Sequence, residues 1–437
     1  MTRPTATPRD PKPALTPKLR FPEFRDGPAW ETQTLGSLVT ISTERVGDNK
    51  CVPMSITSGV GLVSQMEKFG RVIAGDSYKN YLLLKKNDFA YNKSATKEYP
   101  EGFIARYSGE ALAAVPNSIF TCFRINGDSP IPEYLNYLFL GNLHGQWLRK
   151  FIEVGARAHG SLSIDEDDLL ALPVPLPAGR SSRAEQQKIA GCLGTLDELI
   201  GAESQNLDAL KAHKKGLMRQ LFPREGETLP RLRFAEFHSA PKWEMVPLGA
   251  IAEIKLGKML DCQKHTTGLL LPYLNNIAIR WNAVDTSNLP EMYFDDHELD
   301  RFGLKAGDVV VCEGGEPGRA AVWDGRLPDL KFQKAVHRVR FNVPFEPHLL
   351  VQYLEAIAGT PQFEKLFTGG GIKHLTRETF AKLEVPLISE SEQHRIATCL
   401  SSLDDLIAAQ SDRLVALQTH KQGLLQQLFP PSSKTSE

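Results

Sequence analysis

"EQQKIAGCLGTLDELIGAESQNLDALKAHKKGLMRQLFP" spans residues 185–223, and "EQHRIATCLSSLDDLIAAQSDRLVALQTHKQGLLQQLFP" spans residues 392–430. The two stretches align without a gap and are identical at 23 of 39 positions. Each follows an S-x-x-E motif (Ser182–Glu185 and Ser389–Glu392), which is typical of a capping box at a helix start. Each ends in Leu-Phe-Pro, and proline cannot continue the hydrogen bonds of a helix. The repeat therefore predicts two long helices.

Apolar residues recur along both stretches in alternating steps of four and three, as the seam of a coiled coil requires. Two amphipathic helices, each packed on its own domain, are the commoner reading of such a stripe. A period of 3.5 residues sustained over the whole repeat favours the coiled coil instead. The seam positions are Ile189, Leu193, Leu196, Ile200, Glu203, Leu207, Leu210, Lys214, Leu217 and Leu221, and then Ile396, Leu400, Leu403, Ile407, Gln410, Leu414, Leu417, Lys421, Leu424 and Leu428.

The polar seam residues indicate the direction of pairing. In a parallel pair Lys214 would face Lys421, and two ammonium groups would repel and resist desolvation. In an antiparallel pair Lys214 lies beside Leu403 and Lys421 beside Leu196, and each lysine can extend outward to water. We therefore expect an antiparallel coiled coil with an approximate two-fold axis.

The duplication extends beyond the helices. "LRFPEFRDGPAWETQTLGSLV" (19–39) returns as "LRFAEFHSAPKWEMVPLGAIA" (232–252), and "LPVPLP" (172–177) returns as "LEVPLI" (383–388). The chain thus reads as a mixed α/β domain followed by a long helix, twice, which is an α+β fold. The expected boundaries are a disordered N-terminal tail (1–18), a first domain (19–180), a first helix (181–223), a linker (224–231), a second domain (232–388), a second helix (389–430) and a C-terminal tail (431–437).

Composition narrows the function classes. The 437 residues carry a net charge of −1, whereas a nucleic-acid binder usually has a basic excess. This balance counts against DNA binding by the chain alone but leaves room for a local basic face. No apolar run is long enough to cross a membrane, and the six cysteines form no C-x-x-C pair. We expect a cytoplasmic protein without a membrane segment.

The sequence contains none of the common catalytic motifs. It lacks a G-x-x-x-x-G-K-[ST] phosphate loop, a G-x-G-x-x-G turn, H-E-x-x-H and G-x-S-x-G. It also lacks the Asn/Asp-Pro-Pro-Tyr/Phe segment that amino-methyltransferases carry. We therefore expect no catalytic residue and no metal site. Asp88 and Asp308, each after a Leu-Lys pair, are expected to cap turns before core strands.

Two segments of the second domain are candidates for binding. "CEGGEPGRAAVW" (312–323) combines glycines, which let a backbone approach a ligand, with Arg319. A tight hairpin between two strands is the alternative reading, and both hold if the hairpin tip enters a groove. "YLNNIAIRW" (273–281) is strand-like, and asparagine and arginine side chains can pair with adenine and guanine. An ordinary polar strand explains the same residues, which are Asn275, Asn276 and Arg280.

Comparable loops occur in glycine-rich or polar stretches of both domains. They are "YNKSATKEYPEGF" (91–103), "GARAHGS" (155–161) and "GGGIKHL" (369–375), and the last two occupy corresponding places ahead of the helices. Basic residues at such places suit phosphate contact, and solvated loop side chains are the alternative. The candidates are Asn92, Lys93, Lys97, Arg157, His159, Lys373 and His374.

The repeated L-R-F-x-E-F…W…LG frame, the P-x-P…EQ-x-x-I entry into each helix and the Leu-Phe-Pro ending resemble the specificity subunits of type I restriction-modification enzymes. The resemblance covers nearly the whole chain after residue 18. It implies that 19–180 and 232–388 are target recognition domains, each reading one half of a gapped DNA site. It also implies that the helices form the spacer and bind two methyltransferase subunits. A helix of 39 residues is ~58 Å long, or about 17 base pairs.

The same resemblance places the chemistry in other subunits. The methyltransferases would use S-adenosylmethionine, and separate motor-nuclease subunits would use ATP and Mg²⁺ and cleave the DNA. This chain would bind none of these cofactors. Two other functions remain open from the residues, namely a coiled-coil scaffold joining two protein-binding domains and an enzyme with an unrecognised site.

Overall fold

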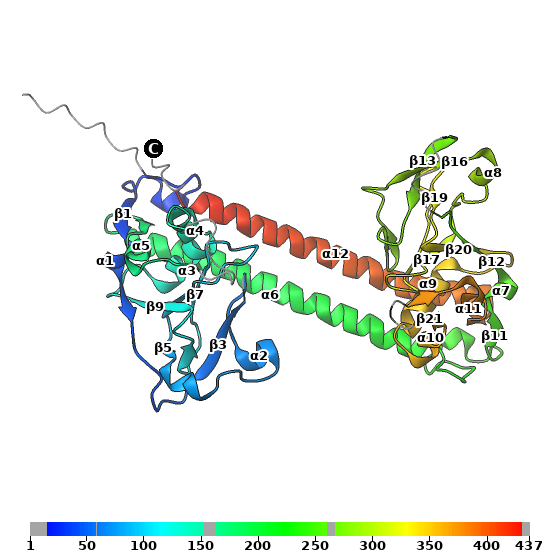
Figure 1. The fold of residues 1–437 in the computed structure, drawn as a ribbon, viewed down its shortest axis with the longest axis horizontal. Helices are drawn as coiled ribbons and strands as arrows, with labels where there is room; N and C mark the ends of the chain where they lie inside the picture. Colours follow the sequence, from blue (N-terminus) through cyan, green and yellow to red (C-terminus); the bar gives the residue numbers. More distant parts are fainter. Residues whose placement is uncertain are drawn as a thin grey trace, which may run out of the picture. The chain divides into compact units, whose positions relative to one another are not determined.

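The structure, a computed structural model, describes residues 15–57, 59–152, 162–259, 267–369, 371 and 373–430. The chain forms two compact units. Unit 1 comprises residues 1–202 and 414–437, and unit 2 comprises residues 203–413. The two long helices, α6 (Ser182–Leu221) and α12 (Glu390–Leu428), each contribute one half to unit 1 and the other half to unit 2 (Figure 1).

Each unit contains a four-stranded antiparallel sheet with the same connectivity (Figure 1). In unit 1 the order is β2 (Val39–Ser42), β9 (Phe120–Ile125), β6 (Phe89–Asn92) and β7 (Phe103–Arg106). In unit 2 it is β12 (Ala252–Leu256), β20 (Val336–Phe341), β17 (Val309–Cys312) and β18 (Ala320–Val322). The stretches "LKKNDFAYNK" (84–93) and "LKAGDVVVCE" (304–313), which are weakly similar, therefore contain the same strand of the two sheets.

A second sheet in each unit contains one parallel pair. In unit 1 the order is β4 (Gly61–Ser64), β3 (Val52–Thr57), β8 (Ala113–Val115) and β5 (Leu82–Leu84), with β3 and β8 parallel. In unit 2 it is β16 (Glu291–Phe294), β13 (Leu269–Leu274) and β19 (Lys331–Phe332), with β13 and β19 parallel. Both units are thus mixed α/β domains, as the sequence predicts.

Short elements complete the units. Two-stranded antiparallel ladders join β1 (Glu31–Thr34) to β10 (Pro173–Leu176), β11 (Glu244–Pro247) to β23 (Glu384–Leu387), β14 (Ile279–Arg280) to β15 (Ala283–Val284) and β21 (Phe367–Thr368) to β22 (His374–Leu375). The 3₁₀ helices are η1 (Pro22–Phe24), η2 (Asp76–Asn80) and η3 (Ala235–Phe237). The short α-helices are α1 (Leu35–Leu38), α2 (Gln65–Phe69), α3 (Pro132–Leu140), α4 (Leu143–Leu148), α5 (Glu166–Leu170), α7 (Leu248–Ile251), α8 (Asp296–Leu299), α9 (Pro347–Ile357), α10 (Pro361–Glu364) and α11 (Arg377–Phe380).

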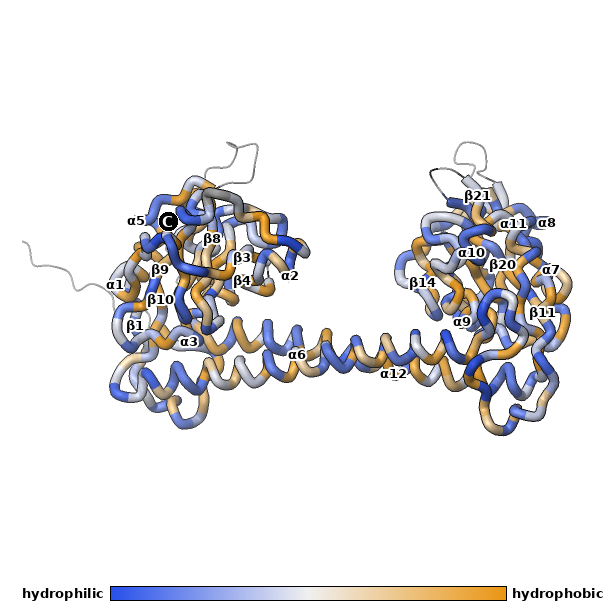
Figure 2. The backbone as a smooth tube through the Cα atoms, turned by 90° about the horizontal axis from the view of Figure 1, so that it is seen from below, coloured by the Kyte–Doolittle hydropathy of each residue, from blue (hydrophilic) through white to orange (hydrophobic). Residues whose placement is uncertain are grey.

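The cores of the two units show that the long helices run antiparallel. In unit 1, Ile189 near the start of α6 shares a buried cluster with Leu428 at the end of α12. In unit 2, Leu221 at the end of α6 shares a cluster with Ile396 near the start of α12. Polar and apolar residues alternate along both helices (Figure 2), and apolar residues near the helix ends belong to these cores. The predicted fold class, with its antiparallel pairing, is confirmed.

The seam lysines pair across the helices rather than extending to water. Lys214 is only 5% exposed, and its Nζ lies 2.6 Å from Oδ1 of Asp404 and 2.6 Å from Oε2 of Glu355. Its counterpart Lys421 pairs with Asp197, the residue equivalent to Asp404. The expectation that both lysines lie exposed beside leucines is therefore wrong for Lys214, because two carboxylates one layer away neutralise it.

A polar contact also lies near the middle of the two helices. Gln410 donates from Nε2 to the backbone oxygen of Glu203 at 3.0 Å, and Arg413 pairs with the Glu203 carboxylate at 2.8 Å. Glu203 and Gln410 would face each other in a parallel pair. They also meet in the antiparallel pair, because both lie close to its centre. Their contact alone does not distinguish the two directions, whereas the lysine pairs do.

The glutamates predicted to complete capping boxes serve another purpose. Glu185 accepts two hydrogen bonds from the guanidinium of Arg20, at 2.7 and 2.8 Å, and one from the indole of Trp30 at 3.2 Å. Its own backbone N–H donates to the Ser181 oxygen, and α6 already begins at Ser182. The capping-box assignment is wrong for Glu185, because the buried Arg20 offers a stronger, charge-assisted partner.

The second copy repeats this arrangement. Glu392 accepts from Arg233 at 2.7 Å twice and from Trp243 at 3.2 Å. Only the serine half of the box is present here, since Ser389 accepts from the backbone of Glu392 at 3.4 Å. We call each arginine–tryptophan–glutamate set (Arg20, Trp30, Glu185 and Arg233, Trp243, Glu392) an entry clamp. It fastens the repeated L-R-F…W frame to the start of the helix that follows the domain.

The glutamine after each clamp glutamate holds another helix start. Gln186 accepts from the backbone N–H of Ile131 at 2.9 Å, and Gln393 accepts from that of Glu346 at 2.8 Å. Ile131 and Glu346 are the N-cap residues of α3 and α9. The E-Q pair of the repeat therefore fixes both the domain frame and its main helix against the long helix.

Candidate nucleic-acid interface

The candidate loops begin at equivalent places in the two units. Lys93, just after β6, donates its backbone N–H to Ile119 and accepts from the N–H of Leu162. Glu313, just after β17, donates in the same way to Ala335 and accepts from Leu375. Each hairpin is thus bridged on one side to the strand beside it and on the other to the segment that precedes the long helix.

An aspartate and an arginine set the position of each hairpin. Asp88 caps the turn before β6 by accepting from the Lys85 backbone at 2.8 Å, and both of its oxygens accept from Arg124 at 2.7 Å. Asp308 does the same before β17 with Arg340, again at 2.7 Å twice. The expected turn caps are present. The arginines were not singled out from the sequence, although both stand two residues before the asparagine that follows the second strand of the sheet.

The glycine-rich stretch of unit 2 forms a hairpin, because β17 and β18 are antiparallel neighbours. Gly315 has φ +81°, and a Cβ there would lie 2.8 Å from Nδ2 of Asn276. Gly318 has φ +91°, and a Cβ there would lie 2.3 Å from the ring of Phe363. The glycines are needed because other side chains would force the hairpin away from its neighbours.

Several predicted residues of unit 2 converge at this hairpin. Asn276 donates to the Gly314 oxygen at 3.1 Å, and Arg319 donates to the Asn276 oxygen at 2.8 Å. The exposed His374 lies beside Gly314, since a Cβ on that glycine would approach its Nδ1 to 3.2 Å. The structure therefore brings three segments that are distant in sequence to one edge of the domain.

The guanidinium of Arg319 is engaged within the protein. It pairs with Glu316 at 2.5 Å as well as with the Asn276 oxygen, and its side chain is 16% exposed. Arginine in this environment holds the hairpin against the 275–280 segment. Lys373 is likewise paired, with Glu364, and its ammonium lies 5.9 Å from the ring centre of Phe367.

The 273–281 segment is not one continuous strand, contrary to the strand-like reading. β13 ends at Leu274 and β14 begins at Ile279, with a turn between them. Asn275 stabilises that turn by accepting from the Ala278 backbone at 3.0 Å. Arg280, the cation of this segment, is exposed. Its guanidinium donates to the backbone oxygen of Ile277 at 2.6 Å.

In unit 1 one of the candidates, Asn92, lines a smaller cavity. Asn92 is 8% exposed, accepts from the Ser94 backbone at 3.0 Å, and lines a cavity of about 310 Å³ together with Lys68 and Thr96. Lys93 is half-buried and Lys97 is exposed. Arg157 and His159 lie outside the described residues.

Titratable groups in the described residues show no reactive centre. Burial raises the pKa of the Cys312 thiol to about 11 and raises that of Cys122 further, so both are protonated at neutral pH. Burial lowers the pKa of His144 to about 4 and lowers that of His337, so both are neutral and hydrogen-bond to backbone oxygens. Among the residues that the structure describes, no group of histidine, cysteine, aspartate or glutamate side chains is arranged to hold a metal ion.

The described residues contain no candidate membrane span. None of their helices combines the length and the apolar character that crossing a bilayer requires.

Comparisons with known proteins agree on one family. The profile of the type I restriction modification DNA specificity domain matches residues 241–419. The putative type I restriction enzyme MjaX specificity subunit of Methanocaldococcus jannaschii is 28% identical over 316 residues, covering 70% of this chain and 69% of the relative. The type I restriction enzyme MjaVIII specificity subunit of the same organism is 25% identical over 267 residues, covering 59% and 61%.

Two solved structures share the fold. A chain from a study of complex assembly and conformational transition of the type I R-M system has a TM-score of 0.58 and 17% identity, covering 92% of this chain and 97% of that one. The S subunit from M. genitalium has a TM-score of 0.55 and 14% identity, covering 96% and 100%. At these identities the likeness concerns the fold.

Proposed function

We propose that this chain is a type I restriction-modification specificity subunit and that each of its two domains reads one half of a gapped DNA site. The observation that carries this proposal is the duplication itself. Each unit presents an equivalent hairpin, positioned by the same Asp–Arg pair and bridged to the segment before a long helix. Two divergent loops on two equivalent frames suit a site with two different halves.

The long helices set the distance between the two half-sites in this proposal and dock two methyltransferase subunits. A helix of 40 residues is about 60 Å long. Motor-nuclease subunits complete the assembly. S-adenosylmethionine, ATP and Mg²⁺ are used by those partners, so that this chain selects the site and performs no catalysis.

The test is selection of bound sequences from random duplexes by the chain purified with its methyltransferase partner. A gapped two-part motif is the expected result. Replacing residues 19–180 by the corresponding domain of a relative should change one half of that motif and leave the other intact. Enriched duplexes without a two-part motif would leave a protein-binding scaffold as the better account.

The role of the helices has its own test. Deleting one heptad from the middle of α6 and one from the facing part of α12 removes about 10 Å from each helix, or about three base pairs of gap. We expect a shorter gap between unchanged half-sequences. A gap of unchanged length would refute the spacer role without affecting the reading role.

A further inference from the structure

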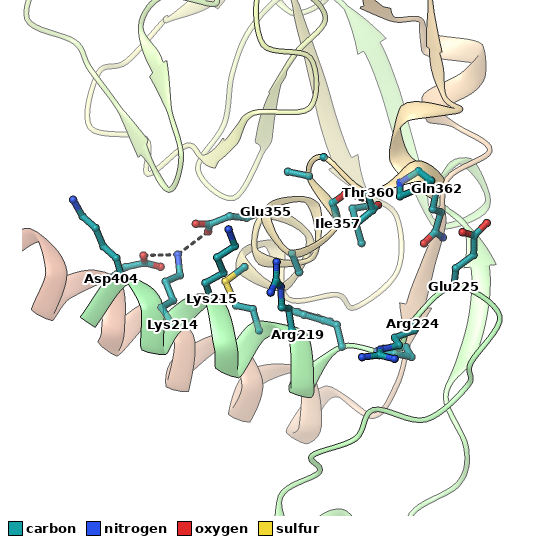
Figure 3. A pocket seen from close by; sticks show the side chains of 18 of the residues that line it. Lys214, Lys215, Arg219, Arg224, Glu225, Glu355, Ile357, Thr360, Gln362 and Asp404 are labelled. Atoms are coloured by element: carbon teal, nitrogen blue, oxygen red, sulfur yellow. Dashed lines mark hydrogen bonds and ion pairs between the residues drawn. The ribbon is translucent and has the colours of Figure 1, made fainter. Parts of the chain in front are cut away.

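Unit 2 contains a groove that the DNA-reading role does not use (Figure 3). It lies between the last turns of α6 and the end of α9, continues along the segment up to Pro361, and has a volume of about 1020 Å³. Such a volume is within the range of ligand and peptide sites in proteins.

The groove has an apolar floor. Ala358 and Pro361 are exposed, Ala356 and Ile407 are half-buried, and all four line the groove above the buried Met218 and Phe222. Apolar surface of this kind gains free energy when a partner removes it from water. A ligand that carries only charge would not bury this apolar surface and would not gain that free energy.

Cations follow the α6 side of the groove at intervals of one helical turn. They are Lys211, Lys215 and Arg219, and Arg224 continues the row beyond the helix. Figure 3 shows the side chains of Lys215 and Arg219 rising from α6 toward the end of α9. All four are exposed, and within the described part of the chain no ion pair engages the side chains of the three helical cations.

The carboxylates that line the groove are already compensated. Glu355 and Asp404 share the buried Lys214, and burial raises the pKa of Asp404 despite that partner. Glu225 pairs with Lys365 at 3.1 Å. The charge left for a ligand is therefore positive.

The duplicated helix lacks this charge. The positions of α12 equivalent to Lys211, Lys215 and Arg219 are all glutamine, namely Gln418, Gln422 and Gln426. The neighbouring Lys214, Leu217 and Leu221 are retained as Lys421, Leu424 and Leu428. Packing requirements alone do not explain the difference, because all six differing side chains are exposed in their own units.

We propose that the basic groove of unit 2 (Lys211, Lys215, Arg219, Arg224, with Ala356, Ala358, Pro361 and Ile407 as its apolar floor) binds an acidic, amphipathic segment of a partner protein, one per chain. Carboxylates spaced by one helical turn would pair with the row of cations, which lies on an α-helix with about 6 Å between successive members. Apolar side chains of the same segment cover the floor. A nucleic acid backbone matches the charge but has no apolar surface for the floor, so the groove favours a peptide.

The test uses the full-length chain and a fluorescein-labelled helical peptide with glutamate at every fourth position and leucine on the adjoining face. A twin peptide has glutamine at each glutamate position. The variant K211Q/K215Q/R219Q gives α6 the side chains that α12 carries at the same positions. We expect fluorescence anisotropy to show about tenfold weaker binding of the glutamate peptide to this variant, since each exposed ion pair contributes modestly.

A matched variant, K242Q/K305Q/K382Q, removes three exposed lysines of unit 2 that do not line the groove. It should bind the glutamate peptide as the unchanged chain does. Equal binding of the two peptides to the unchanged chain, or equal loss in both variants, would overturn the proposal. Displacement of the peptide by a duplex oligonucleotide, dependent on the same three cations, would assign the groove to nucleic acid instead. None of these outcomes depends on whether the two domains read a gapped site.

Discussion

The two entry clamps and the two hairpins, β6–β7 and β17–β18, have diverged to different extents. Glu185 and Glu392 each accept two guanidinium hydrogen bonds of 2.7–2.8 Å and one indole hydrogen bond of 3.2 Å. The hairpins, in contrast, differ in length and in almost every side chain, with a lysine after β6 where an acidic residue follows β17. The difference indicates that attachment to the helices is under one common constraint that the exposed loops do not share, as the proposed reading of two different half-sites would require.

The largest expected effect follows from breaking an entry clamp. Glu185→Ala leaves the guanidinium of Arg20 buried and unpaired, and we expect unit 1 to lose about 3–5 kcal/mol of stability. Glu392→Ala should cost unit 2 a similar amount. Hydrogen-exchange mass spectrometry in urea measures the stability of each unit separately. Asp48→Asn, at an exposed pair, serves as the control and should change neither unit. Unequal losses in the two clamp variants would show that the clamps are equivalent in geometry only.

The seam lysines should differ, although their sequence positions are equivalent. Lys214→Met leaves two mostly buried carboxylates without their cation, and we expect a loss of about 3 kcal/mol. Lys421→Met frees only Asp197, whose side chain is 40% exposed, so the loss should stay below about 1 kcal/mol. Urea denaturation of the two variants measures both values. Equal losses would mean that burial does not govern the strength of these pairs.

Acidification should weaken unit 1 through His144. Its pKa is about 4 in the folded chain because of burial, against about 6.5 when unfolded. The unfolded state therefore binds the extra proton first, so stability is lost as the pH falls from about 6.5 through 4, by up to about 3 kcal/mol. His144→Gln removes this dependence, and urea midpoints of unit 1 at pH 7 and 5 should then lie closer together than in the unchanged chain. If the variant loses as much stability between pH 7 and pH 5 as the unchanged chain, groups other than His144 cause the pH dependence.

The smallest expected effect concerns one exposed loop cation. Lys97→Gln removes an exposed lysine of the unit 1 hairpin loop that forms no ion pair with the described residues, and the half-sequence proposed for unit 1 should not change. If Lys97 contacts a phosphate, the slope of log affinity against log salt falls by about 0.9 in magnitude. Binding titrations at several salt concentrations, with the methyltransferase partner present, give that slope. Lys86→Gln at a paired surface site is the control.

Periodicity and duplication made the fold predictable. The 3.5-residue stripe and the lysine positions predicted the antiparallel pairing, and the repeated motifs predicted two α/β domains and the resemblance to type I specificity subunits, which the comparisons confirm. The capping boxes were misassigned because a local motif does not show that Arg20 and Arg233 reach the same glutamates from more than 150 residues away. The exposure of Lys214 was misjudged because Glu355 belongs to α9. The spacing of residues along the long helices does not predict that α9 packs against α6.

The loop candidates were harder to predict. Residue type indicated Asn276 and Arg319 as contacts to DNA or another ligand, yet Arg319 donates to the backbone oxygen of Asn276 and the Asn276 side chain donates to that of Gly314. The sequence does not show directly which polar side chains form hydrogen bonds within the protein. The exposed members, Lys97, Arg280 and His374, remain predictions for DNA contact.

The sharing of the long helices between units has a consequence for synthesis of the chain. The core of unit 1 includes Leu428 and Phe429, and Leu19 donates its backbone N–H to Gln427. The buried core residues of unit 2 that surround the helices all lie between Met218 and Leu400. On the ribosome, where domains generally fold as units while the chain emerges, the second unit can close its core first. The first unit must wait, with an apolar face uncovered, until the last helix has been made.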